Sequence, residues 1–273
     1  MSNDFKKSFL KTLWILKEYL PVIIVGGGWA PLIYYHYLVK DKSKEPIRTR
    51  DIDLFVKINV PVLGNRTVDQ LLTDSGLESK FKSHDNPPVI HYQGDIEGDN
   101  VEIEFLTDRR GATGDSVIEV QKGLHAVPLR FVSIILENSI EVDIDDLLIK
   151  GKHQPLKIRV PSPEAYIFHK GLIFDRRKEK TKKAKDLYYI FDILANCDML
   201  HDGIINGIKD LKKEYPAWFR SFERNLSECF RDLDSKGVSL ISSQRPAYAF
   251  PEMAGDQFSR YVLGIFQHIL SNI

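Results

Sequence analysis

Two stretches of this 273-residue chain decide its fold: Val25-Gly26-Gly27-Gly28-Trp29-Ala30 and Arg48-Thr49-Arg50-Asp51-Ile52-Asp53-Leu54-Phe55. The first predicts a glycine turn between a short apolar strand and a helix. The second predicts a strand that carries two aspartates two residues apart. Because alternate residues of a strand point to the same face, we expect Asp51 and Asp53 to project side by side, with the apolar residues packed on the opposite face.

The paired aspartates indicate a site for a cation. Adjacent carboxylates repel one another unless a cation lies between them. Magnesium binds through one or two carboxylates together with substrate phosphates, and the N–H groups of a glycine turn can hold those phosphates. Downstream, 101–106 alternates apolar and acidic residues, so that Glu102 and Glu104 share one face. If that strand neighbours the first, a third carboxylate joins the pair, and the pattern predicts metal-dependent phosphoryl or nucleotidyl transfer. The alternative is a set of solvent-facing acids on half-exposed strands.

Composition narrows the class of protein. Lys plus Arg and Asp plus Glu are equal at 38 each, so bulk charge does not indicate a nucleic acid or a membrane as partner. The two cysteines exclude a disulfide framework and predict a reducing, cytoplasmic setting. The apolar stretch 21–39 is interrupted by glycines, Pro31 and His36, so we expect a strand and a buried helix there and no membrane span. No strong signal for oligomerisation is present.

Periodicity predicts an α+β protein: a small mixed-sheet domain over 1–160 followed by an all-helical domain over 161–273. Helices are expected over 5–20, 29–39, 68–75, 164–174 and 182–196, with more toward the C-terminus. Strands are expected over 22–25, 50–58, 89–93, 100–106, 131–137, 140–149 and 156–160. A turn over 94–99 joins the hairpin, and 109–121 and 234–251 are expected to be irregular.

Taken in order, the motifs of the first half resemble the nucleotidyltransferase superfamily that includes DNA polymerase β. Gly27-Gly28-Trp29-Ala30 resembles its glycine turn, and Asp51-Ile52-Asp53-Leu54 resembles its metal-binding pair. Glu104-Phe105-Leu106-Thr107 resembles the strand that carries its third acid. A dinucleotide-binding turn is the weaker interpretation, because Pro31 stands where the third glycine of that motif belongs.

The resemblance continues into the helical half. The stretch 163–170 ends in His169-Lys170, and Lys183-Ala184-Lys185-Asp186-Leu187 follows after Arg176-Arg177. This order is similar to the bacterial GSU-type nucleotidyltransferase-fold proteins and to the type IV toxin nucleotidyltransferases of toxin–antitoxin pairs. In that comparison Lys170 and Asp186 complete the site.

The resemblance implies an activity and a site. An NTP would donate its nucleoside monophosphate to an acceptor hydroxyl on a tRNA, a protein or a small molecule, with Mg²⁺ or Mn²⁺ as cofactor. The implied catalytic and metal-binding residues are Asp51, Asp53 and Glu104. The implied nucleotide-binding residues are Gly27, Gly28, Arg50, Lys170 and Asp186.

Two departures from the family pattern leave alternatives open. Trp29 replaces the small hydroxyl residue that often follows the glycines, and the third acid is Glu104, with Glu102 as a competitor for its role. The alternative function is a catalytically degenerate protein of the same fold that binds a nucleotide or a partner. The basic stretch 176–185 is either a solvated helix face or a basic wall that contacts triphosphate or RNA.

Overall fold

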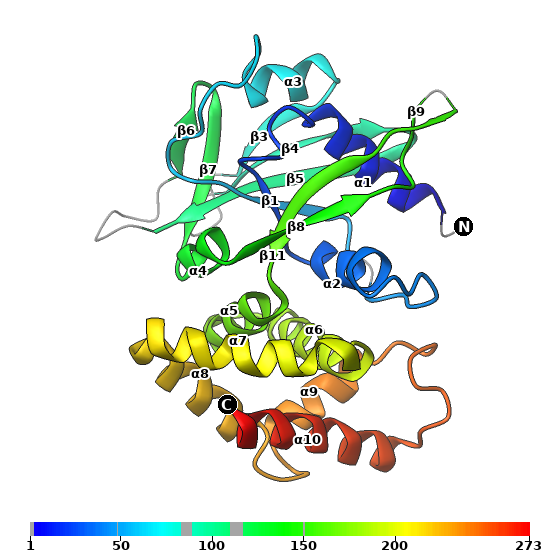
Figure 1. Ribbon diagram of the computed structural model, residues 1–273, viewed down its shortest axis with the longest axis vertical. Helices are drawn as coiled ribbons and strands as arrows, with labels where there is room; N and C mark the ends of the chain where they lie inside the picture. The colour runs from blue at the N-terminus through cyan, green and yellow to red at the C-terminus, as the bar shows by residue number, and fades with distance from the viewer. Residues whose placement is uncertain (1–2, 48, 83–88, 110–116, 150) are drawn as a thin grey trace. The chain divides into compact units, whose positions relative to one another are not determined.

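The computed structural model describes the chain apart from residues 1–2, 48, 83–88, 110–116 and 150. The chain forms two compact units (Figure 1). The first unit combines residues 1–33 with 48–161, and the second combines 34–47 with 162–273. The first contains a mixed β-sheet and the second is helical, which confirms the predicted α+β class.

The described strands of the first unit form a nine-stranded mixed sheet with the order β3-β4-β5-β2-β1-β11-β8, and β7 pairs with both β5 and β6. A separate two-stranded ribbon joins β9 to β10. The strands are β1 (Ile24–Val25), β2 (Asp51–Phe55), β3 (Glu78–Lys82), β4 (Val89–Ile96), β5 (Asp99–Asp108), β6 (Ile118–Gln121), β7 (Leu124–Leu129), β8 (Ser139–Ile144), β9 (Leu148–Ile149), β10 (Lys152–His153) and β11 (Leu156–Pro161).

The centre of the sheet sets the positions of the acidic residues. β2 pairs antiparallel with β1 and parallel with β5. The apolar residues that alternate with the acids, Ile52 and Ile103, are buried. Burial of one face therefore fixes the register of these strands, since a slip of one residue would move every side chain to the other face. An apolar cluster anchors their ends against a short helix, and its buried members are Ile24, Phe55, Leu106, Val127, Val132 and Ile135.

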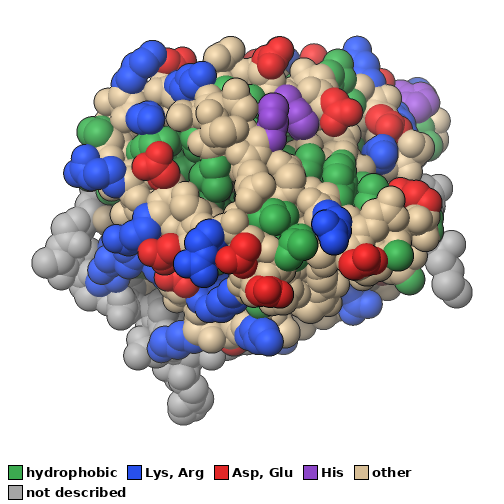
Figure 2. All heavy atoms as spheres, turned by 90° about the horizontal axis from the view of Figure 1, so that it is seen from below, with side chains coloured by type: hydrophobic (Ala, Val, Ile, Leu, Met, Phe, Trp, Pro, Cys, Tyr) green, Lys and Arg blue, Asp and Glu red, His purple; other side chains and the backbone are tan. Residues whose placement is uncertain are grey.

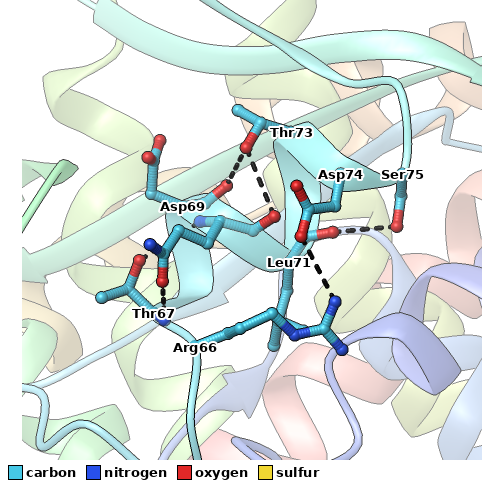
Figure 3. Close-up of polar contacts among 8 residues, drawn as sticks. Arg66, Thr67, Asp69, Leu71, Thr73, Asp74 and Ser75 are labelled. Carbon is cyan, nitrogen blue, oxygen red and sulfur yellow. Dashed lines mark hydrogen bonds and ion pairs between the residues drawn. The ribbon is translucent and has the colours of Figure 1, made fainter.

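The described residues of this unit form four helices: α1 (Asn3–Ile15), α2 (Trp29–Ile33), α3 (Val68–Asp74) and α4 (Val132–Glu137). The start of α3 is a capping box (Figure 3), in which the Thr67 side chain accepts from the Gln70 N–H and the Gln70 side chain accepts from the Thr67 N–H. Such a cap satisfies two of the N–H groups that a helix start leaves unpaired. Arg66 also pairs with Asp74 at 3.3 Å, which ties the approach to the helix to its last turn.

The second unit opens with a π-helical turn, η1 (Tyr34–Leu38), and is otherwise built from helices. Two of its helices, α5 (Pro163–Ile173) and α6 (Lys180–Asn196), are largely buried, with nine buried residues in α5 and ten in α6. The other helices are α7 (His201–Glu214), α8 (Pro216–Cys229), α9 (Lys236–Gln244) and α10 (Gly255–Asn272), with 3₁₀ turns η2 (Phe174–Arg176) and η3 (Asp198–Leu200). The face in Figure 2 interleaves Lys and Arg with Asp and Glu, without a large patch of one sign.

The strand predicted over 131–137 is wrong, because this stretch forms the helix α4. Its run of apolar residues fits both periods, and a tertiary contact decides between them. The Asp108 side chain accepts a hydrogen bond of 2.9 Å from the N–H of Ser133, which caps the start of the helix. Val132 and Ile135, one helical turn apart, then enter the apolar cluster.

Three connections also differ from the prediction. The stretch 234–251 contains α9, whose apolar residues Val238 and Ile241 lie one turn apart and are buried. Within the predicted loop 109–121, the described end forms β6, because it pairs with β7; residues 110–116 lie outside the described part. The hairpin turn is confined to Glu97 and Gly98, since the pairing of β4 with β5 runs to its tip.

Among the described helices, none is long and apolar enough to cross a membrane.

Candidate functional site

The acids predicted on two separate strands lie next to each other in the sheet. In the parallel pairing of β2 with β5, Asp51 stands opposite Glu102 and Asp53 stands opposite Glu104. Residues opposite each other in neighbouring strands project from the same face, and the strands are about 4.8 Å apart. The predicted adjacency is therefore confirmed, and four carboxylates share one face.

The glycine turn lies directly against this face. Gly27 has a φ of +57°, and a Cβ added to it would lie 1.8 Å from Oδ2 of Asp53. The neighbouring Gly26 N–H donates to the carbonyl oxygen of Asp53 at 2.9 Å, which holds the turn to β2. Only a residue without a side chain fits this contact, so the turn and the first acidic pair form one structural element.

Exposure differs along the acidic face. Asp51 and Arg50 are exposed at the start of β2, whereas Asp53 and Glu104 are half-buried. Gly28 is buried in the turn. Within the described residues, no three His, Cys or acidic side chains are gathered as a group that could hold a metal ion. The strand register thus aligns the carboxylates in two rows, one on β2 and one on β5, and their oxygens do not converge on one position.

His91 lies beside the acidic residues, and the sequence analysis did not single it out. It lies on β4 opposite Glu104, and its side chain is completely buried. Its Nε2 atom is 3.8 Å from Oε1 of Glu102. In the described part of the chain, neither ring nitrogen has a hydrogen-bond partner. The sequence around His91 does not indicate that this residue lies beside two acids, because its position depends on the pairing of three strands.

Trp29 belongs to the core and not to the acidic face. Its ring stacks on Phe9 at a centroid distance of 3.7 Å and an angle of 8°, and only 2% of the residue is exposed. The departure from the family pattern at this position therefore has a structural role, which is to anchor the start of α2 on α1.

In the helical unit, the structure brings Lys170 and Asp186 together as expected. Nζ of Lys170 on α5 lies 2.5 Å from Oδ1 of Asp186 on α6. Nε of Arg177 lies 2.9 Å from the other carboxylate oxygen. Asp186 is 4% exposed and Lys170 is 7% exposed. The buried carboxylate of Asp186 therefore pairs with two cations. The second of them, Arg177, belongs to the basic stretch 176–185, within which the sequence analysis did not distinguish one residue from another.

Aromatic rings complete the surroundings of Lys170. Its Nζ atom lies 5.6 Å from the ring centroids of both Tyr166 and Tyr189. Ring faces attract an ammonium group at this distance. The spacing of Tyr166 and Lys170, one turn apart on α5, follows from the sequence, whereas the ring on α6 does not.

The ionisation of Asp186 depends on these partners. Burial alone would raise the pKa of its carboxyl group, but Lys170 and Arg177 more than offset burial and hold the pKa below its usual range. The carboxylate is therefore charged at neutral pH, and Lys170 is fixed in place by a partner that stays ionised.

The sequence is similar to a known protein family. A family model described as nucleotidyltransferase matches residues 16–198, which is well over half of the chain. The chain belongs to this nucleotidyltransferase family. The matched residues include the glycine turn, both acidic strands and the Lys170–Asp186 pair.

Other comparisons add little detail. One similar solved structure is an antigenic nucleotidyltransferase-like protein from Paracoccidioides brasiliensis, with 16% sequence identity and a TM-score of 0.38. The alignment covers 81% of this chain and 93% of that one. No match is found among curated proteins.

The donor set of the acidic face fits a hard divalent cation. Carboxylate oxygens are the ligands that Mg²⁺ and Mn²⁺ prefer, and no soft sulfur ligand lies among the acids in the two rows. The space over Gly27, which a Cβ would fill, keeps the backbone open beside Asp53. The residues that would hold such an ion are Asp51, Asp53 and Glu104, and Glu102 stands opposite Asp51, two residues before Glu104 on β5.

Proposed function

We propose that this protein transfers a nucleoside monophosphate from an NTP to an acceptor hydroxyl. The observation that carries the proposal is the contact between Gly27 and Asp53, in register with Glu104. This arrangement places an open backbone turn beside two rows of carboxylates. The subfamily, which we propose to be the GSU-type or type IV toxin branch, rests on the ordered motifs of the sequence.

In the proposed reaction the acceptor oxygen bonds to the α-phosphorus and the bond to the bridging oxygen breaks. Pyrophosphate leaves and the hydroxyl proton passes to solvent. A bound Mg²⁺ or Mn²⁺ would supply charge neutralisation at the phosphates and activation of the hydroxyl. Asp51, Asp53 and Glu104 would hold the ion at the acidic face, while Gly27 and Gly28 would admit phosphate against the backbone.

The helical residues have a separate part in the proposal. Lys170 contributes positive charge to nucleotide binding, and Asp186 fixes its position through the 2.5 Å ion pair. Arg50, exposed beside Asp51, is proposed to contact the nucleotide as well. The acceptor is a tRNA, a protein or a small molecule.

The test is pyrophosphate release from each NTP with Mg²⁺ or Mn²⁺, screened against RNA, protein and metabolite acceptors. We expect Asp53→Asn to abolish release while the fold is kept, because the substitution removes charge but preserves shape. Asp143→Asn, at an exposed position of β8 in the same sheet, is the matched control and is expected to keep full activity. Full activity in Asp53→Asn would contradict the metal assignment. Metal-dependent nucleotide binding without any release would support the degenerate alternative.

A second comparison separates the two candidates for the third acid. We expect Glu104→Gln to reduce the rate far more than Glu102→Gln, since Glu104 is in register with the aspartate that touches the glycine turn. Glu102 instead lies 3.8 Å from His91. Initial rates at saturating Mg²⁺ decide the matter, and the reverse order would move the site two residues along β5.

A further inference from the structure

The second unit contains a pocket that the proposed reaction does not use. Its volume is about 540 Å³, which is in the range of small-molecule sites. The lining comes from the π-helical turn, the loop that follows it, the C-terminal part of α6, and the loop before α10. All of these elements belong to the same compact unit.

Two buried polar residues line the pocket, Asp192 and Tyr35. Asp192 is 5% exposed and Tyr35 is 1% exposed. The Tyr35 hydroxyl interacts with the Asp192 carboxylate. No lysine, arginine or histidine of the described residues forms an ion pair with Asp192. Because a buried carboxylate is costly unless a cation pairs with it, a cationic ligand in the cavity would offset the burial of Asp192.

A chain of hydrogen bonds joins Lys44 to Asp192 through Asn196. Lys44 donates to Oδ1 of Asn196 at 3.1 Å. The Nδ2 group of Asn196 then donates to Oδ1 of Asp192 at 3.0 Å. The Lys44 ammonium group is therefore bonded to the amide of Asn196, and the bond that reaches Asp192 comes from a neutral group.

The lining is acidic and aromatic. Glu45, Asp192 and Glu252 are its acids, and Lys44 is its one cation among the lining residues. Tyr248 and Phe250 add ring surfaces to that of Tyr35. Acidic side chains attract a positive charge, and ring faces attract it too. This combination favours a cationic ligand over a neutral or anionic one.

One wall of the pocket is held rigidly. Phe250 has a φ of +51°, which is uncommon for a residue with a side chain. Arg245 donates to the carbonyl oxygens of Ala249, Phe250 and Met253, and these bonds keep the loop in this conformation. The pocket is thus shaped in advance, which reduces the entropy lost when a ligand binds.

We propose that this pocket binds a small organic cation, with an amine, amidine or guanidine group paired with the Asp192 carboxylate and a flat body against the aromatic wall. The proposal is independent of nucleotidyl transfer, and direct binding tests it without any measurement of activity.

The experiment is a calorimetric titration of the full-length protein with benzamidine, a flat aromatic cation, and with benzamide, its neutral counterpart. We expect benzamidine to bind roughly tenfold or more tightly, because a hydrogen bond to a charged group is stronger than a neutral one. Equal affinities, or no binding of benzamidine, would overturn the proposal.

Variants locate the binding. Asp192→Asn keeps the shape of the side chain and should weaken benzamidine binding roughly tenfold to hundredfold. Glu252→Gln, at the exposed rim, should weaken it only about twofold, in keeping with the small value of exposed charge pairs. Glu223→Gln, on an exposed part of α8, is the matched control and should change nothing. Unchanged affinity in a folded Asp192→Asn protein would contradict the assignment.

The pH dependence provides a measurement that needs no variant. Burial raises the pKa of Asp192 to about 7, and Tyr35, Asn196 and Lys44 lower it without offsetting burial. Other ionisable groups that interact with Asp192 are Tyr188 and Cys197. Ionisation strengthens the pairing, so benzamidine should bind more tightly at pH 8 than at pH 6. A stronger affinity at pH 6 would contradict the proposal.

The same titration of Asp192→Asn identifies the source of this dependence. Dependence that persists in the variant belongs to other groups, among them His36, whose Nε2 atom lies 3.0 Å from the Lys44 carbonyl oxygen. We expect it to disappear in the variant, whereas full persistence would remove Asp192 from the binding interaction.

Discussion

The acids of the sheet unit and those of the helical unit are positioned by different means. On the sheet, the register of β2 and β5 places Asp53 beside Glu104 at a half-buried face, where solvent and a dissolved cation can reach them. On α6, Asp186 and Asp192 are buried, and the protein itself determines whether each is charged. The positions of the sheet acids therefore depend on strand register, whereas the charge of the α6 acids depends on the side chains buried beside them.

The two aspartates of α6 show how much the partner matters. They lie six positions apart in the chain and are almost equally buried, at 4% and 5% exposure. Lys170 and Arg177 pair with the first, and its pKa is lowered. The second accepts from the neutral Asn196, and its pKa is raised to about 7. Burial is the same in both, so the difference in pKa follows from the cations.

The largest effect is expected where buried charge is left unpaired. Asp186→Ala removes the carboxylate from Lys170 and Arg177, and loss of one partner from a buried pair costs about 3–5 kcal/mol. Chemical denaturation measures the change in the free energy of unfolding. The control is Asp175→Ala, whose pair with Lys183 is exposed on the acid's side and should be worth about 0–1 kcal/mol. Equal losses would break the distinction between the buried and exposed pairs.

The next effect concerns Asp192 and depends on pH. Its pKa is raised on folding, so its contribution to stability is fully present below the pKa of the unfolded chain and declines until the pH passes about 7. Asp192→Asn cannot ionise, and it should gain stability relative to wild type between pH 4 and pH 7. The gain has an upper limit on the order of 4 kcal/mol, which corresponds to roughly three pKa units. Denaturation at both pH values measures it, and a constant difference would show that Asp192 is not protonated on folding.

A smaller effect tests the backbone side of the comparison. Gly27→Ala adds a Cβ at a position of φ +57°, where it would also meet Asp53. Strain of this kind costs about 1–3 kcal/mol, and displacement of Asp53 should reduce transfer as well. Gly98→Ala shares the positive φ, at +89°, but its Cβ would meet no atom within 4 Å. If the two variants lose equal stability and both keep full activity, the contact with Asp53 has no functional weight.

The smallest effect is expected on the exposed lysines. Lys178 and Lys180 are exposed, in contrast to the buried Lys170. Their joint replacement by glutamine should change stability and NTP affinity by less than about 0.5 kcal/mol. If an RNA is the acceptor and these lysines guide it, the salt dependence of RNA binding should become weaker. Titrations of NTP with Mg²⁺, and of RNA at several salt concentrations, measure the two effects. A large loss of NTP affinity would place these lysines with Lys170.

The fold and the acidic face could be predicted because the relevant signals are local. Glycine turns and alternating strands are visible in 25–30 and 48–55, and the β2–β5 pairing then follows from one buried apolar face. The elements that were mispredicted depend on distant contacts. The helix α4 is capped by Asp108, which lies 25 residues before Ser133. A short stretch of sequence around the helix therefore does not include the residue that caps it.

The same reasoning explains which site residues were missed. Lys170 and Asp186 could be paired from the ordered motifs, since they match a family pattern. His91 and Asp192 could not be singled out from the sequence, because their surroundings depend on residues of other elements. These residues are Glu104 on the neighbouring strand for His91 and Tyr35 in the π-helical turn for Asp192. A buried acid inside an apolar helix is a signal only when its lack of a cation is known.

The path of the chain between the two units has a consequence for how the protein is made. Residues 34–47 leave the first unit early and belong to the helical one, whose other residues begin only at 162. During synthesis this segment emerges more than a hundred residues before the helices it joins. It carries four of the eleven residues that line the pocket, Tyr35 and Lys44 among them, so a cut after residue 161 would separate these four from the rest of the lining. Separate expression of the halves should therefore yield a helical part without the complete pocket, even if each half folds.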